Sequence, residues 1–351
     1  MDENIELGPG PEFDLIGQIR ARLGVAHEQG ADSVDPRGPE RTIAVGIGDD
    51  AAVTEPGGVT ATSVDALVEG VHFDRASSPP AAIGHKALAS ALSDLAAMGA
   101  IAGEAYVVLG VPESYEPEAT LEICDGLAAL AVASGTRLIG GDLTRATELF
   151  LAVTVVGHAG SAADLVTRAG AMEGSSVVVT GELGGAAAGR LLLADPELVQ
   201  ALGSAAEADA LRERQLRPNP QLAAGLALRG AGAEAMIDLS DGLGSDAAHL
   251  SSAGGVGLRI ELKQVPIQSG VEEVAGVAGV DPLELATAGG EDYELLAVLA
   301  PERHAAAAAA VADAGTTLTS IGEVVPGSKV ELLDADGRLR EPAGYDHFKP
   351  A

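Results

Sequence analysis

Tryptophan is absent from the 351 residues, and four tyrosines and four phenylalanines bring the aromatic share to only 2%. A chain with so few rings lacks the stacking surfaces on which proteins bind single-stranded nucleic acid. Hydrophobic residues nevertheless make up 47% of the chain. We therefore expect a globular protein whose cores are built from alanine, valine, leucine and isoleucine.

Basic residues are also scarce, with 21 lysines and arginines against 52 acidic residues and a net charge of −31. This charge argues against binding to nucleic acid or to an anionic membrane surface by bulk electrostatics. The same excess would repel a nucleotide unless cations lie between the carboxylates and the phosphates. A phosphate-binding function therefore requires bridging metal ions.

Cysteine occurs once, at Cys124, which excludes a disulfide within the chain and a site built from several thiolates. The N-terminal residues lack the basic and apolar regions of a signal peptide. No apolar stretch of about 18 residues runs free of charges or glycine breaks, so a membrane span is not predicted. We expect a soluble, cytoplasmic protein.

The length favours two domains, which we place at residues 1–159 and 160–351. Apolar periodicity predicts an α/β (α+β) fold in which strands and helices alternate in both halves. In the first half we predict helices over 13–23, 80–97 and 117–134, and strands over 43–47, 59–64, 105–109, 137–139 and 149–156. In the second half we predict strands over 177–180, 235–239, 258–262, 295–299, 318–324 and 330–333, and helices over 185–193, 218–229, 243–252 and 301–313.

The most informative pattern is the placement of acidic residues after or within apolar segments, beside glycines. It recurs in Gly46-Ile-Gly-Asp49-Asp50, Ser63-Val-Asp65, Ser93-Asp94, Gly140-Gly141-Asp142, Asp238-Leu-Ser240-Asp241-Gly242 and Gly289-Gly-Glu291-Asp292. A single aspartate in so acidic a chain is more often a solvated surface residue. A surface carboxylate, however, needs no apolar strand leading to it. Together, the motifs favour aspartates brought to a common site at strand ends.

Carboxylates gathered in a cleft repel each other and need neutralising partners. Few lysines or arginines adjoin these motifs, so hard divalent cations are the natural partner. Mg²⁺ takes oxygen ligands, and it is usually held by one or two carboxylates together with substrate phosphates. The pattern therefore favours several Mg²⁺ ions bridging an acidic protein and a polyphosphate.

Three other known motifs fit the sequence less well. Gly46-x-Gly48-x-x-Ala51 matches a form of the dinucleotide fingerprint, but two aspartates would face the pyrophosphate and no clear strand–helix–strand order follows. The P-loop pattern G-x-x-x-x-G-K-[ST] is absent, which excludes a P-loop kinase. Asp238-Leu-Ser-Asp-Gly is too short for an EF-hand.

Three basic or imidazole side chains stand near these motifs. For His72, in Glu-Gly-Val-His-Phe, a structural role in a loop and a contact to substrate are equally compatible with the sequence. Lys86 lies in the predicted helix that leads to Asp94, and the sequence leaves open whether it binds phosphate. Arg168, in Leu-Val-Thr-Arg-Ala-Gly, is suited to bidentate phosphate binding, against the alternative of a surface ion pair.

At these residues the chain resembles the thiamine-monophosphate kinase family, whose superfamily includes aminoimidazole-ribonucleotide synthetase and selenophosphate synthetase. The resemblance runs from about residue 13 to 348, in the order GIGDDAAV, SVDALVEGVHF, KALASALSDLAAMGA, LIGGDLTR, LVTRAGA, LRPNP, AMIDLSDGL, GGEDYELL and GYDHF. It implies transfer of the ATP γ-phosphoryl group to thiamine monophosphate, giving thiamine diphosphate. It also implies an N-terminal domain that dimerises through its sheet and a C-terminal α/β domain, and hence a homodimer.

The resemblance also implies the site residues. Mg²⁺ would be held by Asp50, Ser63, Asp65, Asp94, Asp142, Asp238 and Asp241. ATP would be contacted by Gly141, Asp142, Arg168 and Ser240, and thiamine monophosphate by His72, Glu291 and Tyr345. Either Asp49 or Asp50 is the ligand in the adjacent pair. The acceptor is already an anionic phosphate oxygen, so no strong general base is required.

Two residues depart from the family pattern. Val64 stands where relatives often have a hydroxyl residue, so one metal contact is lost or passes to the backbone. Tyr345 stands where tryptophan is common, and it still offers a ring for stacking.

The alternatives to a thiamine-monophosphate kinase are another ATP-dependent enzyme of the superfamily, such as the purine-pathway ligase, or a non-catalytic maturation factor. A selenophosphate synthetase would need a reactive cysteine in an N-terminal loop, whereas Cys124 lies in a predicted helix.

Overall fold

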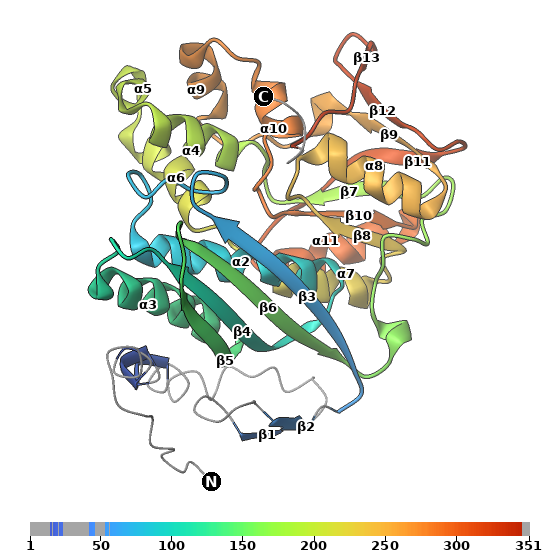
Figure 1. The fold of residues 1–351 in the computed structure, drawn as a ribbon. Helices are drawn as coiled ribbons and strands as arrows, with labels where there is room; N and C mark the ends of the chain where they lie inside the picture. The colour runs from blue at the N-terminus through green and yellow to red at the C-terminus, as the bar shows by residue number, and fades with distance from the viewer. Residues whose placement is uncertain are drawn as a thin grey trace. The chain divides into compact units, whose positions relative to one another are not determined.

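The computed structural model describes residues 15, 17–19, 21–23, 42–45, 53–55 and 57–345. The chain divides into two compact units (Figure 1). The first contains Met1–Leu95 and Ala100–Asp164, and the second contains Ala96–Gly99 and Leu165–Ala351. Both units combine a β-sheet with helices, so the predicted mixed α/β class is confirmed.

The first unit is built on a four-stranded sheet in the order β3-β6-β4-β5. These strands are β3 (Val59–Val68), β4 (Ile101–Val111), β5 (Arg137–Arg145) and β6 (Phe150–Ala159). β6 is antiparallel to both β3 and β4, whereas β4 and β5 run parallel because a helix connects them. A separate antiparallel pair is formed by β1 (Thr42–Val45) and β2 (Val53–Glu55).

Two long helices, α2 (Pro80–Ala97) and α3 (Pro117–Ser134), lie on one side of this sheet (Figure 1). Both start and end as predicted, with proline in the first turn of each helix. Gly135 ends α3 in the left-handed conformation, with φ of 69°. Along β3, side chains alternate between half-buried and exposed, so the face away from the helices is open; Val64 on that face is 66% exposed.

The second unit contains a seven-stranded sheet in the order β13-β12-β9-β11-β7-β10-β8. Its strands are β7 (Ser176–Thr180), β8 (Ala235–Asp238), β9 (Gly257–Glu261), β10 (Leu295–Leu299), β11 (Leu318–Val325), β12 (Val330–Leu333) and β13 (Leu339–Arg340). Only the β12–β9 pair is parallel among these seven strands. The strands of both halves were largely predicted, but this interleaved order was not.

Helices cover both faces of the second sheet. On one face α8 (Leu243–Gly254) packs Leu243 and Leu250 against side chains such as Ile237. On the other face α7 (Leu222–Ala231) and α11 (His304–Asp313), the predicted alanine-rich helix, pack against alternate strand residues. Alternation of side chains along each strand explains how one sheet supplies two cores.

A group of helices in the second unit forms a third core, and most of it was missed. It consists of α4 (Gly185–Ala194), α5 (Pro196–Ala201), α6 (Ala205–Leu216), α9 (Val271–Ala278) and α10 (Pro282–Ala288). Only α4 was predicted. The predicted helix over 218–229 begins later than expected, because α7 starts at Leu222 after Pro218 and Pro220.

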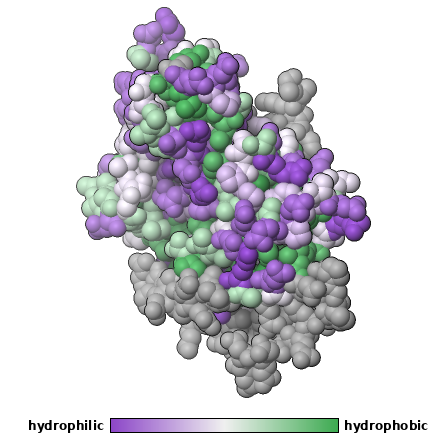
Figure 2. All heavy atoms as spheres, turned by 90° about the vertical axis from the view of Figure 1, so that its left-hand side faces the viewer, coloured by the Kyte–Doolittle hydropathy of each residue, from purple (hydrophilic) through white to green (hydrophobic). Residues whose placement is uncertain are grey.

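None of the helices among the described residues combines the length and the apolar character that a membrane crossing requires. Hydrophilic side chains are spread over much of the described surface in Figure 2, as the excess of acidic residues leads one to expect.

Candidate functional site

In the first unit, three predicted metal ligands lie between β3 and α2. Ser63 and Asp65 are two residues apart on β3 and therefore point to the same side of the strand. The Ser63 hydroxyl donates a hydrogen bond to Oδ2 of Asp94, which α2 contributes. Asp65 Oδ1 accepts the N–H of Ala66 at 2.8 Å. The structure thus gathers two carboxylates and a hydroxyl oxygen on the helix side of an edge strand.

Asp65 does not follow its strand, as we predicted, but lies inside it. β3 extends to Val68 because it pairs with β6 without interruption from Val59 to Val68. Val64 points to the opposite, open face. Any side chain at this position would point away from Ser63 and Asp65.

His72 and Lys86 meet at the turn after β3. His72 Nδ1 accepts the N–H of Val68 at 3.0 Å, so the hydrogen of the neutral ring is on Nε2. The buried Lys86 reaches this turn from α2, and its Nζ donates to the carbonyl oxygen of His72 at 3.2 Å. These two contacts fix the position of His72 relative to the helix that carries Asp94.

Gly141 and Asp142 lie on β5, the strand at the far edge of the same sheet. They were expected after a strand that ends at residue 139, but β5 runs on to Arg145 beside β4. A Cβ on Gly141 would come within 2.1 Å of the Val107 carbonyl oxygen, so only glycine fits this close approach.

The register places Asp142 in one row with Val108, Ala152 and Ala66, on the open face. Three strand spacings, about 14 Å, separate this row on β5 from β3. Asp142 and Asp65 therefore lie at opposite edges and on opposite faces. Within one copy of the first unit, the structure does not bring them together.

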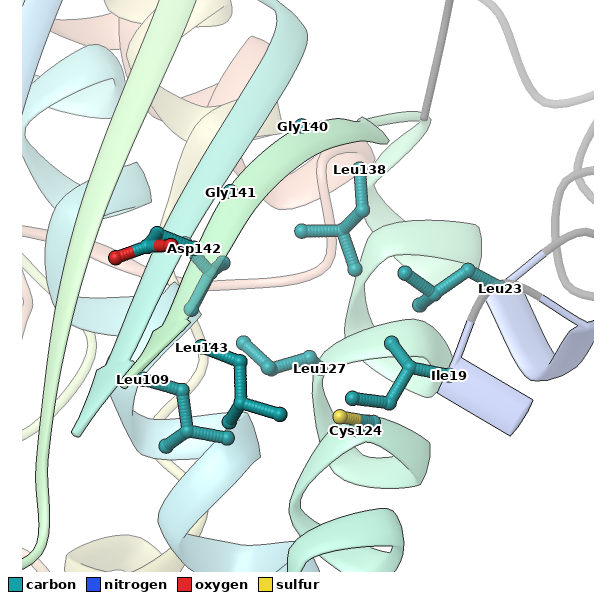
Figure 3. A pocket seen from close by; sticks show the side chains of 11 residues that line it. Ile19, Leu23, Leu109, Cys124, Leu127, Leu138, Gly140, Gly141, Asp142 and Leu143 are labelled. Atoms are coloured by element: carbon teal, nitrogen blue, oxygen red, sulfur yellow. The ribbon is translucent and has the colours of Figure 1, made fainter. Parts of the chain in front are cut away.

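An apolar cavity of about 140 Å³ lies between β5, α3 and the helical residues near the N-terminus (Figure 3). Its lining residues include Ile19, Leu23, Leu127, Leu143 and Cys124. Burial, with a smaller contribution from the neighbouring Asp125, raises the pKa of the Cys124 thiol to about 12. This thiol is therefore no nucleophile at neutral pH, which adds a physical argument against a selenophosphate-synthetase-like reaction.

In the second unit, an acidic group forms where β8 leads into α8. Asp238 is the last residue of β8, one residue before the predicted end of this strand, and it is buried. Asp241 lies in the following turn, and Asp246 lies in the first turn of α8. Oδ2 of Asp246 accepts the N–H groups of Asp241 at 3.1 Å and Gly242 at 3.0 Å. Sequence reasoning missed Asp246, although it stands only five residues after Asp241.

The Asp246 side chain shows how closely these carboxylates approach. Burial, and then the charges of Asp238 and Asp241, raise its pKa to about 8. Ionising all three groups therefore costs free energy unless a cation lies nearby. Within the described residues, no three acidic, histidine or cysteine side chains converge closely enough to hold a metal ion by themselves.

We predict that Asp246→Asn stabilises the metal-free protein more at pH 8 than at pH 5. A folded-state pKa above the ordinary value of 3.8 means that the folded chain binds more protons than the unfolded chain between about pH 4 and pH 8. The stability of the native chain in that window therefore falls as the pH rises. The asparagine oxygen still accepts both N–H groups but has no charge.

Urea unfolding with EDTA, at both pH values, measures this effect. The stability difference between variant and native chain should grow by about 2 kcal/mol or more from pH 5 to pH 8. Repulsion from the rest of the acidic surface is common to both proteins and cancels. A difference that is equal at the two pH values would refute the raised pKa.

Two of the three predicted substrate residues flank this same turn. The N–H of Glu291 donates to the Ser240 carbonyl oxygen at 2.8 Å, and the N–H of Tyr345 donates to the Asp241 carbonyl oxygen at 3.0 Å. Tyr345 is 49% exposed. Segments that are about 50 and 100 residues apart in the chain thus meet at Ser240 and Asp241. Here the structure brings the predicted residues together.

The Glu291 loop has an unusual backbone. Glu291 and Tyr293 have φ values of 60° and 50°, in the left-handed region that non-glycine residues rarely occupy. Such conformations occur where the surrounding structure holds them, and they cluster at binding sites. The backbone therefore adds an observation for Glu291 that the sequence pattern alone did not contain.

Two further acidic residues of this loop are buried and were not assigned roles. Asp292 accepts N–H groups of Gly184 at 2.7 Å and Ala186 at 3.1 Å, at the start of α4. Burial raises its pKa to about 6, against the lowering effect of Arg214 and these N–H groups. Glu294 accepts the Thr180 hydroxyl at 2.6 Å and pairs with Arg214. These carboxylates anchor the loop.

Arg168 is exposed in the segment before β7. The preceding residue, Thr167, accepts the N–H of Met236 at 3.0 Å. This contact places the backbone beside β8, two residues before Asp238. Arg168 thus belongs to the same unit as Ser240, whereas Gly141 and Asp142 belong to the first unit.

Two models of protein domain families match this chain. Residues 48–159 match the model of the N-terminal domain of AIR synthase related proteins, and residues 172–335 match that of the C-terminal domain. The thiamine-monophosphate kinase of Escherichia coli (strain K12) is 38% identical over 345 residues, covering 96% of this chain and 98% of the relative. The chain belongs to the thiamine-monophosphate kinase family of AIR synthase related proteins.

Solved structures agree with this assignment. The thiamine-monophosphate kinase of Stenotrophomonas maltophilia K279a aligns with a TM-score of 0.78 at 34% identity, covering 96% of this chain and all of that one. A structure described as AaThiL complexed with AMPPCP and TMP aligns with a TM-score of 0.72 at 32% identity. It covers 82% of this chain and 87% of the other.

Proposed function

We propose that this chain is a cytoplasmic thiamine-monophosphate kinase, which transfers the γ-phosphoryl group of ATP to thiamine monophosphate. The observation that carries the proposal is 38% identity to such a kinase over nearly the full length of both chains. A relative at 32% identity has been captured with AMPPCP, an ATP analogue, and with TMP, thiamine monophosphate. Some of the predicted site residues belong to the first unit and the others to the second.

We further propose that Mg²⁺ is held by the oxygen donors of the two acidic groups. These are Ser63, Asp65 and Asp94 with Asp50 in the first unit, and Asp238 with Asp241 in the second; Asp50 lies outside the described residues. Asp142, the seventh predicted ligand, lies on the opposite edge and face of the first sheet. The donors fit the ion because all are oxygens, and because Asp246 shows that the second group is short of positive charge. Bound Mg²⁺ would neutralise the phosphates and the charge that develops on them during transfer.

The roles of the other residues follow from phosphoryl-transfer chemistry. The transition state is loose, so positioning and charge neutralisation supply most of the acceleration. Gly141, Asp142, Arg168 and Ser240 would position ATP, with Arg168 adding positive charge. His72, Glu291 and Tyr345 would position thiamine monophosphate. The cationic thiazolium ring suits the carboxylate of Glu291.

A coupled assay of ADP release tests this proposal. Chain, ATP and Mg²⁺ should release ADP in proportion to the thiamine monophosphate added, and thiamine itself should not substitute for it. ADP release that does not depend on added thiamine monophosphate would point to another ATP-dependent reaction of the superfamily. No release under any of these conditions would favour a non-catalytic maturation factor.

We predict that substitutions in the two substrate-contact groups separate the Michaelis constants. Glu291→Gln removes a charge that faces the cationic substrate, so binding of thiamine monophosphate should weaken by about 1–3 kcal/mol and its KM should rise roughly 5- to 150-fold, with little change in the KM for ATP. Arg168→Ala should show the reverse. Steady-state kinetics with each substrate varied in turn measures the ratio. Equal losses for both substrates in both variants would remove these assignments.

The open face of the first sheet supports the proposal of a homodimer. Val64, Ala66 and Val108 present apolar side chains to solvent on this face, and a two-fold axis would pack the same patch of two copies together. Asp142 lies in the same row. The proposed interface would therefore run beside a predicted ATP-binding residue.

Light scattering at micromolar concentration should give twice the chain mass. Val64→Glu places a charge on the open face, and it should shift the mass toward that of one chain. Thr60→Glu, on the same face at the start of β3, serves as a peripheral control. A single-chain mass for the native protein would contradict the dimer.

A further inference from the structure

The loop that carries Glu291 is held in part by the helix α6, to which the proposed function assigns no role. Arg214 of α6 donates to the carbonyl oxygen of Asp292 at 2.9 Å and pairs with the carboxylate of Glu294. The next residue, Gln215, donates from Nε2 to Oε2 of Glu291 at 2.7 Å. Two consecutive residues of α6 thus bind three parts of the loop. Arg214 binds the Asp292 backbone and the Glu294 carboxylate, and Gln215 binds the Glu291 carboxylate.

Helix packing brings Gln215 to this position. A Cβ on Gly189 of α4 would come within 2.0 Å of the Leu211 carbonyl oxygen and 3.1 Å of the Gln215 Cβ. Glycine at this point lets α4 and α6 approach closely. The start of α4 in turn binds the Asp292 carboxylate. The two helices and the loop are therefore connected through directly contacting residues.

The glutamine itself is unusual, because half of its amide is unused. Gln215 is buried, with 6% of its surface exposed, and its Oε1 accepts no hydrogen bond from the described residues. An apolar side chain of similar length would fill this place without stranding a buried acceptor. What glutamine adds over such a residue is the N–H donor to Glu291. A carboxylate can only accept, so the bond also fixes which end of the amide faces it.

We propose that Gln215 is the positioning residue for Glu291. Its amide N–H donates to Oε2 of Glu291 and holds the carboxylate in one orientation. The Glu291 carboxylate is thereby held in place for the cationic ring of the substrate. The inference rests on the proposed function, and it makes α6 a determinant of selectivity for thiamine monophosphate.

Gln215→Met tests this role, because methionine keeps the length of the side chain and removes the donor. We expect the KM and the calorimetric Kd for thiamine monophosphate, measured with Mg²⁺ and AMPPCP for the latter, to rise about tenfold. The KM for ATP should stay within about twofold. Gln221→Met is the matched control, since Gln221 donates to Glu294 at 3.1 Å in the same buried network without touching Glu291. The Gln221→Met variant should have a lower melting temperature and unchanged KM values for thiamine monophosphate and ATP.

A double-mutant cycle separates positioning from general support. In a Glu291→Gln background, Gln215→Met should change the KM for thiamine monophosphate by no more than about twofold, because the charge on which it acts is gone. Full additivity of the two substitutions, equal losses for both substrates, or an unchanged KM for thiamine monophosphate in folded Gln215→Met would each overturn the inference. Failure of the native chain to bind thiamine monophosphate at all would overturn the proposed function and this inference together.

Discussion

Removal of divalent metal with EDTA is expected to abolish ADP release, with a fall of at least about a thousandfold, and added Mg²⁺ should restore it. The physical reason is the net charge of −31 on a protein that must bind polyphosphate. Two like charges about 4 Å apart repel by about 4 kcal/mol at an effective dielectric constant near 20. One such uncompensated pair already accounts for a factor of about a thousand.

The control for this experiment is a measurement of secondary structure with and without metal. Far-ultraviolet circular dichroism with EDTA should match that with Mg²⁺, because the cores of both units consist of apolar side chains rather than metal ligands. Full activity after exhaustive EDTA treatment would contradict the metal role of all seven assigned residues. Loss of the helical signal would mean that the metal supports the fold rather than the reaction.

Asp94→Asn is expected to reduce kcat at least about a hundredfold while the protein stays folded. The asparagine oxygen still accepts the Ser63 hydroxyl, so the contact between α2 and β3 remains. What disappears is the negative charge that Mg²⁺ requires. Without metal, the loss of a charge beside Asp65 should leave the melting temperature unchanged or raise it.

Two measurements decide this prediction, namely kcat and the rise in melting temperature caused by Mg²⁺, which should shrink in the variant. Asp125→Asn is the control, because Asp125 is an exposed carboxylate on α3 whose partner is Arg22. Asp142→Asn should lose turnover to a similar extent. Near-normal kcat in Asp94→Asn or Asp142→Asn would remove that residue from the metal site.

Local signals were sufficient for much of the fold. The prolines that open α2 and α3 and the glycine at position 135 mark helix ends through their own backbone preferences, so both helices were predicted at their observed bounds. The strand that delivers Asp238 was likewise visible as a short apolar run. In each of these cases the determining interactions lie within a few residues of the chain.

The predicted strand ends were wrong where pairing with a neighbouring strand determines how far a strand extends. Asp65 and Asp142 stand beside serine or glycine residues that suggested strand ends, yet β3 and β5 continue past them because β6 and β4 pair with them beyond these residues. Whether Asp142 faces the helices or the open side depends on register, and a shift of one residue would reverse it. No local pattern encodes that register.

The residues missed at the site share this long-range character. Gln215 is 76 residues from Glu291, and Asp292 is 108 residues from the Gly184 N–H that it accepts. Gln215 lies outside every predicted helix and strand, and Asp292 was named with Glu291 in an acidic motif but received no role. Only the packing of α4 and α6 against the loop reveals that they are buried. Asp246 also carried a readable signal, as a third carboxylate near Asp238 and Asp241.

The central claim is direct transfer of the terminal phosphoryl group of ATP to the phosphate of thiamine monophosphate. ATP labelled with ¹⁸O in the nonbridging oxygens of its γ-phosphoryl group tests it, with the products followed by ³¹P nuclear magnetic resonance. The account predicts that the label appears in the terminal phosphate of thiamine diphosphate, in step with ADP. Label in inorganic phosphate, with thiamine monophosphate unchanged, would contradict it.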